Sequence, residues 1–296
     1  GSARTATALD HVGVPRTPAV VGPRQRLTGA RGLVHGAAGE VWLLLQAAAG
    51  IPIATQIAFP ERTIEIAAAA RFDVLLERRA RREPMAHILG QREFWSLAFK
   101  VTADTLDPRP DSETLVQAVL DQLPDRSAAL RLIDFGTGTG CLLLALLHEL
   151  PNATGAGVDV SAAALAVATE NANALGLAQR TSFHRSDWDD GLDSGFDIVL
   201  SNPPYIPSED IAGLQPEIAS YEPRLALDGG PDGLDAYPRL GPATARLLVP
   251  DGLAAFEIGI GQGESVGRIM AAAGLRHIAT ARDLAAGERS LLFRKS

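Results

Sequence analysis

The sequence predicts an α/β protein with an open, mainly parallel sheet, preceded by a small helical domain. Short apolar runs alternate with helical patterns from Arg131 onward, and a glycine-rich turn joins the first run to its helix. Two amphipathic helical patterns precede them. With 296 residues, of which 46% are hydrophobic, the chain is long enough to bury the cores of two domains.

The N-terminal part is predicted to be helical. Residues 3–35 are rich in Pro, Gly and Arg and only weakly periodic, which leaves their order open. Residues 40–49 and 61–82 each have the apolar spacing of an amphipathic helix, and Pro52 and Pro60 predict a short connection between them. We therefore expect a small helical domain at this end of the chain.

A β-hairpin is expected to link the two domains. Apolar and polar side chains alternate over residues 86–103 in the manner of two short strands. The predicted boundaries are 1–85 for the N-terminal helical domain, 86–104 for the hairpin linker and 105–296 for the sheet domain.

The sheet domain is predicted to begin with a helix at residues 114–123 and to continue through seven strands. The strands are expected near residues 131–135, 154–159, 181–185, 196–201, 252–258, 275–281 and 289–294. Open α/β sheets bind ligands at the carboxyl ends of their parallel strands. Polar residues at these ends are therefore the candidates for a site.

The first strand runs into a turn that allows close approach of a ligand. Asp134 lies near the end of the strand, and the turn consists of Gly136, Thr137, Gly138, Thr139 and Gly140. Glycines at a strand-to-helix turn let a ligand come near the backbone. The spacing is G-x-G-x-G and not G-x-G-x-x-G, so a pyrophosphate site is the weaker interpretation. The alternative is a structural turn whose backbone Asp134 caps.

Acidic and aromatic residues follow at the ends of the next two strands. Asp159 ends the strand at 154–159, and a carboxylate there can accept hydrogen bonds from two ribose hydroxyls. Asp187 and Trp188 follow the strand at 181–185, where an indole ring could cover an adenine, although Trp188 also suits an ordinary core position. Their order along the chain favours a ligand site at this edge of the sheet.

The fourth strand runs into Asn202, Pro203, Pro204 and Tyr205. A planar NH2 group is a poor nucleophile because its lone pair is delocalised. The side-chain oxygen of Asn202 and the main-chain oxygen of Pro203 can hold its two N–H bonds and direct the lone pair at a methyl donor. The prolines fix φ and add no competing donor, and Tyr205 offers a flat wall. The alternative is a strand that ends in a tight turn.

These motifs resemble those of S-adenosylmethionine-dependent methyltransferases of the seven-stranded, Rossmann-like class I. The resemblance implies an antiparallel edge formed by the last two strands. It implies S-adenosylmethionine as cofactor, with the methionine part at the glycine turn, the ribose at Asp159 and the adenine by Trp188. The cofactor-binding residues so implied are Asp134, Gly136, Thr137, Gly138, Thr139, Gly140, Asp159, Asp187, Trp188 and Asn202.

The sequence upstream narrows the resemblance. Residues 83–95, 105–113 and 228–235 are similar to stretches of the peptide chain release factor N5-glutamine methyltransferases. The family implies transfer of a methyl group to the glutamine of the GGQ motif of class-1 release factors, and an N-terminal domain that docks the substrate. The implied catalytic residues are Asn202, Pro203 and Tyr205, and the implied substrate-binding residues are Asn202, Pro203, Pro204 and Tyr205.

Some positions depart from the family pattern or lie outside its motifs. Phe135 stands where Leu is usual, Ser112 where Thr is usual, and Asp107 where an apolar residue is expected. Glu257 ends a predicted buried strand, where it is either a brace for the substrate loop or a paired core carboxylate. The long polar segment 206–235 leaves from the catalytic turn and is expected to shape a substrate channel.

Three other functions fit parts of the sequence. Adenine also presents a planar NH2 group, so N6-methylation of DNA or RNA is an alternative, although a flipped base requires a basic groove. A glutamine of a ribosomal protein is a second alternative substrate. A non-enzymatic adapter is the third, and the intact motifs argue against it.

Charge and composition limit these choices. Residues 1–103 carry 13 Lys+Arg against 8 Asp+Glu, whereas residues 104–296 carry 14 against 27, which disfavours a nucleic-acid substrate. Cys141 is the only cysteine and the six histidines lack metal-ligand spacing, so we expect no disulfide and no metal site. Without a signal peptide or transmembrane run, we expect a cytoplasmic protein that binds no membrane, and a monomer.

Overall fold

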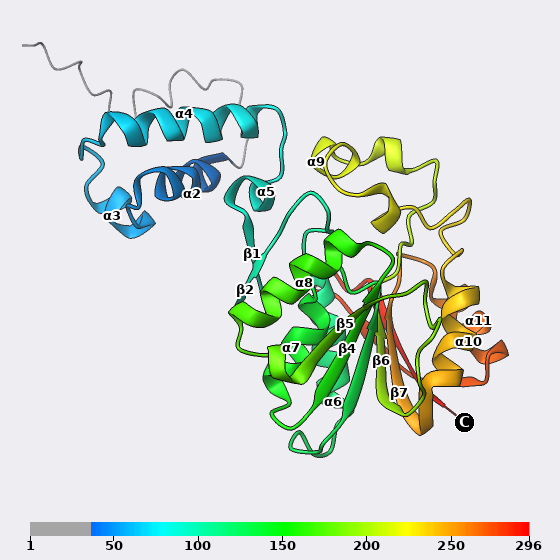
Figure 1. Ribbon diagram of the computed structural model, residues 1–296. Coiled ribbons are helices and arrows are strands. Elements are labelled where there is room, and N and C mark those ends of the chain that lie inside the picture. Colours follow the sequence, from blue (N-terminus) through cyan, green and yellow to red (C-terminus); the bar gives the residue numbers. More distant parts are fainter. Residues whose placement is uncertain (1–36, 296) are drawn as a thin grey trace, which may run out of the picture. The chain divides into compact units, whose positions relative to one another are not determined.

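The computed structural model describes residues 37–295, so the segment 1–35, whose order the sequence leaves open, lies outside the described residues. The chain divides into two compact units, one up to Ala80 and one from Arg81 to the end (Figure 1). The second unit contains both the hairpin and the sheet.

The N-terminal unit consists of helices α2 (Ala37–Ala49), α3 (Ile53–Ala58) and α4 (Ile66–Ala80). The prediction of a short connection between Pro52 and Pro60 is wrong in one respect, because residues 53–58 form helix α3. Proline is well suited to the start of a helix, and Pro52 occupies the N-cap position of this one without a side-chain hydrogen bond. The side chain of Gln56 fixes the helix by donating to the carbonyls of Trp42 at 3.1 Å and Ile51 at 2.7 Å.

The second unit begins with helix α5 (Met85–Leu89), so the start of the predicted hairpin is helical. Strands β1 (Gln91–Phe94) and β2 (Leu97–Lys100) then pair antiparallel around a two-residue turn. Trp95 and Ser96 in this turn have φ of 54° and 58°, as a tight hairpin requires. Trp95 is held there because its backbone N–H donates to Glu113 at 2.8 Å and its indole N–H donates to Glu149 at 2.9 Å.

The seven predicted strands of the sheet are confirmed, in the order β5-β4-β3-β6-β7-β9-β8. They are β3 (Arg131–Phe135), β4 (Thr154–Asp159), β5 (Thr181–Arg185), β6 (Phe196–Ser201), β7 (Leu248–Glu257), β8 (Leu275–Arg282) and β9 (Glu288–Lys295). Strands β3 to β7 run parallel to one another, whereas β9 pairs antiparallel with both β7 and β8. The sheet is therefore parallel up to an antiparallel edge.

Helices cover both faces of the sheet (Figure 1). One layer holds α6 (Glu113–Asp121), α7 (Cys141–Glu149) and α8 (Ala162–Ala174). The other holds α10 (Tyr237–Leu247) and α11 (Gly263–Ala272), two helices that we do not predict from the sequence. Because successive residues of a strand point to opposite faces, Leu132 belongs to the core on one side of the sheet and Ile133 to the core on the other.

The segment 206–235 is built of short turns. It contains the 3-10 helices η3 (Ile211–Gly213) and η4 (Arg224–Ala226) and the short helix α9 (Pro216–Ala219). A parallel β-bridge joins its first residue, Ile206, to Asp228. The segment is therefore an ordered part of the structure that starts at the end of β6. Within residues 37–295, no helix has the length and apolar character needed to span a bilayer.

Candidate active site

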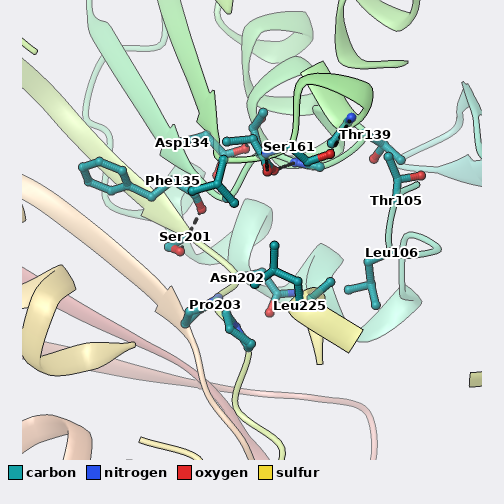
Figure 2. A pocket seen from close by; sticks show the side chains of 18 of the residues that line it. Thr105, Leu106, Asp134, Phe135, Thr139, Ser161, Ser201, Asn202, Pro203 and Leu225 are labelled. Carbon is teal, nitrogen blue, oxygen red and sulfur yellow. Dashed lines mark hydrogen bonds between the residues drawn. The ribbon is translucent and has the colours of Figure 1, made fainter. Parts of the chain in front are cut away.

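A cavity of about 430 Å³ opens at the carboxyl ends of the parallel strands. Most of the predicted site residues line it: Asp134, Gly136, Thr137, Gly138, Thr139, Asp159, Asp187, Trp188, Asn202, Pro203 and Pro204. In the view of Figure 2, Asp134 and Thr139 lie above the cavity and Asn202 and Pro203 below it. The structure thus joins the glycine turn and the Asn-Pro-Pro turn in one space.

Two predicted site residues, Gly140 and Tyr205, are not part of the lining. Gly140 forms the N-cap of α7 with φ of 80°, and a Cβ there would lie 3.1 Å from the side chain of Leu144. Its conformation and this close packing explain the glycine. Tyr205 is half-buried, and its hydroxyl donates to Glu257, which is not part of the lining, at 3.1 Å.

The glycine turn takes its shape from backbone angles that favour glycine. Gly136 and Gly138 have φ of 65° and 54°. The N–H of Thr137 donates to the carbonyl of Val158 at 3.0 Å, and the N–H of Gly138 donates to Asp159 Oδ2 at 3.0 Å. The turn is therefore tied to the end of the neighbouring strand β4.

Asp134 is a buried carboxyl group in the cavity lining, and it is 1% exposed. Its Oδ2 accepts a hydrogen bond from the hydroxyl of Thr137 at 2.7 Å, whereas its Oδ1 has no hydrogen-bond partner among the described residues. Burial raises the pKa of Asp134 to about 7, against the hydrogen bond from Thr137 and with a smaller contribution from Asp159. Asp134 therefore lines the cavity and keeps one buried acceptor oxygen without a donor among the described residues.

Asp159 and Trp188 lie at the ends of β4 and β5. Asp159 accepts from the backbone N–H groups of Gly138 and of Ser161, the latter at 2.9 Å, and a carboxylate has acceptor sites beyond these two. The centroid of the Trp188 ring lies 6.1 Å from that of the Phe135 ring. The backbone of Trp188 has a φ of 59°. Trp188 is thus both packed against the core and part of the cavity wall.

The turn after β6 contributes Asn202 and Pro203 to the cavity lining. Ser201 anchors it, because its hydroxyl donates to the carbonyl of Phe135 at 2.9 Å (Figure 2). The Asn202 side-chain NH2 group donates to the hydroxyl of Ser112 at 3.4 Å. Among the described residues, no donor reaches Asn202 Oδ1 or the carbonyl oxygen of Pro203. Both oxygens can therefore accept hydrogen bonds from a bound group.

Motif reasoning missed several residues of the cavity. Leu225 of η4 and Arg239 of α10 both line it, and Leu225 is 66% exposed (Figure 2). The Arg239 guanidinium donates to Asp187 at 2.8 Å and lies 5.9 Å from the centroid of the Trp188 ring. Leu225 lies in the segment 206–235, which the sequence predicts to shape a substrate channel, whereas Arg239 belongs to no recognisable motif.

Cys141 lies beside the glycine turn, but its environment is unsuited to a nucleophile. It lines the cavity, and burial raises the pKa of its thiol to about 12. A thiol with such a pKa carries almost no thiolate at neutral pH. The side chain is therefore part of the wall.

Comparisons with known proteins agree with this geometry. A crystal structure of a methyltransferase from Pyrococcus furiosus has the same fold, with a TM-score of 0.51 and 15% identity, over 74% of this chain and 98% of that one. Family models for the Methyltransferase small domain and the PrmC N-terminal domain match residues 107–215 and 24–90. The fold and the site define an S-adenosylmethionine-dependent methyltransferase of the seven-stranded class.

Curated relatives identify the family. The release factor glutamine methyltransferase of Caulobacter vibrioides is 46% identical over 84% of this chain and 86% of its own length. That of Rhodospirillum rubrum is 46% identical over 79% of this chain and 72% of its own length. The chain belongs to the family of release factor glutamine methyltransferases, so the predicted family is confirmed.

Proposed function

We propose that this protein transfers a methyl group from S-adenosylmethionine to the side-chain nitrogen, N5, of the glutamine in the GGQ motif of class-1 peptide chain release factors. The observation that carries the proposal is that one cavity is lined both by the glycine turn and by Asn202 and Pro203, whose oxygens have no donor among the described residues. The names of its relatives support a release factor as the substrate. A substrate that works in translation is consistent with activity in the cytoplasm.

The lining supports a site for the cofactor. Asp134 Oδ1 is a buried acceptor without a partner among the described residues, and it suits an α-ammonium group. Asp159 keeps acceptor capacity for ribose hydroxyls, and Asp187 and Trp188 would border the adenine. The volume is within the usual range for small-molecule sites. The bound cofactor supplies a methyl group on a cationic sulfonium.

Asn202 and Pro203 would hold the substrate amide. Their two oxygens can accept both N–H bonds of a glutamine carboxamide, which fixes the plane of the group and leaves its nitrogen lone pair directed away from them. As the nitrogen forms its new bond to carbon, positive charge develops on it and both hydrogen bonds strengthen. Acceptors that bind the transition state more tightly than the ground state accelerate the reaction, and correct placement adds to this effect.

The mouth of the cavity favours a protein substrate over a nucleic acid. Leu106 and Leu225 contribute apolar surface near Asn202 (Figure 2), and Pro223 also lines the cavity. The acidic residues outnumber the basic ones by 27 to 14 over residues 104–296, whereas binding of a phosphate backbone requires clustered Lys and Arg. A peptide loop with small residues beside its glutamine fits this surface better than a flipped base.

The direct test is transfer of labelled methyl from S-adenosylmethionine to a purified class-1 release factor. We expect label on the release factor and none on a variant in which the GGQ glutamine is alanine. Duplex DNA and total ribosomal protein serve as competing substrates. Equal labelling of the alanine variant, or label on DNA, would overturn the proposal.

Asn202→Ala should separate catalysis from cofactor binding. It removes one of two acceptors for the substrate amide, so we expect kcat to fall by about 100-fold or more, as when other preorganised transition-state contacts are removed. Calorimetry with S-adenosylhomocysteine should give a dissociation constant within a few-fold of that of the wild type. Equal losses of both would contradict the role assigned to Asn202.

A further inference from the structure

Three segments that are far apart in the sequence meet beside the catalytic turn, and one of them contributes Ser112 to the cavity lining. Ser112, at the end of η1 (Pro110–Ser112), donates its hydroxyl hydrogen to Glu257 Oε2 at 2.5 Å. The hydroxyl of Tyr205 donates to the other oxygen, Glu257 Oε1, at 3.1 Å. The side-chain NH2 of Asn202 reaches the Ser112 oxygen at 3.4 Å, a long hydrogen bond.

The burial of Glu257 requires an explanation. Glu257 is the last residue of β7 and is 1% exposed. Burial raises the pKa of its carboxyl group above the ordinary value. A buried carboxylate is costly unless donors satisfy it, and here two hydroxyls do so, with Arg289 nearby as a favourable charge. The carboxylate thus fixes the direction of both hydroxyl groups.

The direction of the Ser112 hydroxyl decides how Asn202 is oriented. A serine hydroxyl has one hydrogen and two lone pairs. Because its hydrogen points to Glu257, Ser112 can only accept from Asn202, and only the NH2 end of the carboxamide can face it. The oxygen of Asn202 must then point the other way. The two ends of an amide are nearly equal in shape, so hydrogen bonding alone sets this choice.

We propose that Ser112 and Glu257 are positioning residues, which hold the Asn202 carboxamide with its oxygen toward the cavity. This inference rests on the proposed function in one respect, namely that the Asn202 oxygen accepts from the substrate. A reversed carboxamide would present NH2 to the substrate NH2, and two donors cannot form a hydrogen bond.

A second arm of the same network places the rest of the turn. The backbone carbonyl of Tyr205 accepts from the Gln262 side chain at 3.0 Å, while its hydroxyl is held by Glu257. With both ends of Tyr205 fixed, the preceding residues have little freedom to rotate. Glu257 therefore supports the catalytic turn on two sides, at Asn202 through Ser112 and at Tyr205 directly.

The orientation of Asn202 can be observed without any methyl transfer. The chain has four asparagines, so selective 15N-asparagine labelling gives four side-chain amide signals, of which Asn202→Ala identifies one. We expect the Asn202 NH2 hydrogens to exchange slowly in the wild type and several-fold faster in Ser112→Ala and in Glu257→Gln. In the glutamine variant an NH2 can face Ser112, which frees its hydroxyl hydrogen for the Asn202 oxygen.

Control variants separate this role from a general loss of packing. Ser112→Thr keeps the hydroxyl and should retain the slow exchange. Ser290→Ala removes a buried hydroxyl on β9, opposite Glu257, that has no hydrogen-bond partner among the described residues, and it should leave the Asn202 signal unchanged. The signal of Asn171, whose NH2 donates to two backbone carbonyls, provides an internal reference.

Kinetics complete the test. For Ser112→Ala and Glu257→Gln we expect kcat on the release factor to fall by about 10- to 100-fold, as is usual for positioning partners, with unchanged cofactor affinity and with recovery in Ser112→Thr. An unchanged Asn202 signal together with an unchanged kcat would overturn the inference. If wild-type protein methylates no release factor while the Asn202 signal responds as expected, the proposed function fails but the network stands.

Discussion

At the scale of single residues, Asp134 is a buried carboxyl group of the site in which one oxygen accepts a hydrogen bond and the other does not. It has one strong hydrogen bond, from Thr137, and its pKa of about 7 lies well above 3.8 because of burial. Between these two pH values the folded protein holds a proton that the unfolded chain has lost. The contribution of Asp134 to stability is therefore lost as pH rises from 3.8 towards about 7. Above that range the charged carboxylate is prepared for a cation.

We expect cofactor affinity to follow the ionisation of Asp134. Binding of S-adenosylhomocysteine, which carries the same α-ammonium group, should strengthen with rising pH by at most about tenfold per unit and level off above about 7. Asp134→Asn should bind more weakly at high pH and show a flat profile. Calorimetry between pH 5.5 and 8.5 measures both. A variant that retains the slope would show that a group other than Asp134 causes it.

At the scale of elements, an ion pair joins the segment before α6 to the segment after β6. The Arg109 guanidinium lies 2.6 Å from both carboxylate oxygens of Glu222, and Asp107 lies 3.8 Å from the same arginine. Burial raises the pKa of Glu222 to about 7, although Arg109 opposes this. The pair holds η4 and its exposed Leu225 at the mouth of the cavity.

Arg109→Ala should destabilise the protein, because it leaves the buried Glu222 without its cation. Loss of one partner of a fully buried pair costs about 3–5 kcal/mol, and we expect about 2 kcal/mol here because the Arg109 side chain is 31% exposed. Urea unfolding at pH 8 measures the change. The double variant with Glu222→Gln no longer has the unpaired charge of Glu222 and should recover part of the loss. No recovery would show that Arg109 acts through packing alone.

Strand β4 carries two glycines that allow close packing, and only one of them touches the site. A Cβ on Gly157 would lie 2.7 Å from the Phe183 ring and 2.9 Å from the Thr137 hydroxyl, whereas a Cβ on Gly155 would lie 2.5 Å from Leu143. Both alanine variants should lose about 1–3 kcal/mol of stability through overpacking. Only Gly157→Ala displaces the donor to Asp134, so only this variant should also weaken binding of S-adenosylhomocysteine.

Gly155→Ala serves as the matched control in calorimetry at a temperature where both variants are folded. If both variants bind S-adenosylhomocysteine with equal affinity, the Thr137 hydroxyl does not contribute to cofactor binding.

The sequence predicted those elements whose local pattern matches their tertiary role. Strands β3, β6 and β7 each contain a buried apolar run, and Ser161 caps α8, accepting from the N–H of Ala164 at 3.2 Å. Helix α3 was not predictable, because a helix of six residues carries too little periodicity to be recognised. It also depends on the hydrogen bonds of the Gln56 side chain. Helix α10 contains Pro242, which argues against a helix in sequence terms.

The same distinction holds for the site. Residues in motifs at strand ends were predictable, since the carboxyl ends of parallel strands must meet at one edge. Ser112 and Glu257 are 145 positions apart and form one hydrogen bond. Such long-range pairing follows from the order of the strands and the path of the chain, which a single sequence does not reveal.

At the scale of the whole molecule, the cavity belongs to one of the two units. Its lining runs from Ala103 to Arg239, entirely within the unit that starts at Arg81. No residue between 37 and 80 lines it. The cofactor should therefore stabilise the larger unit alone.

Hydrogen exchange followed by mass spectrometry can test this separation. A ligand that binds only the folded state, present at 100 times its dissociation constant, stabilises that state by about 2.7 kcal/mol. With S-adenosylhomocysteine at this level, the slowest amides of β3, β6 and β7, which exchange through global unfolding of their unit, should slow by about 100-fold. Amides of α2 and α4 should keep their rates, because their core is separate. Equal slowing in both units would mean that they unfold together and that the division at Ala80 is not a thermodynamic boundary.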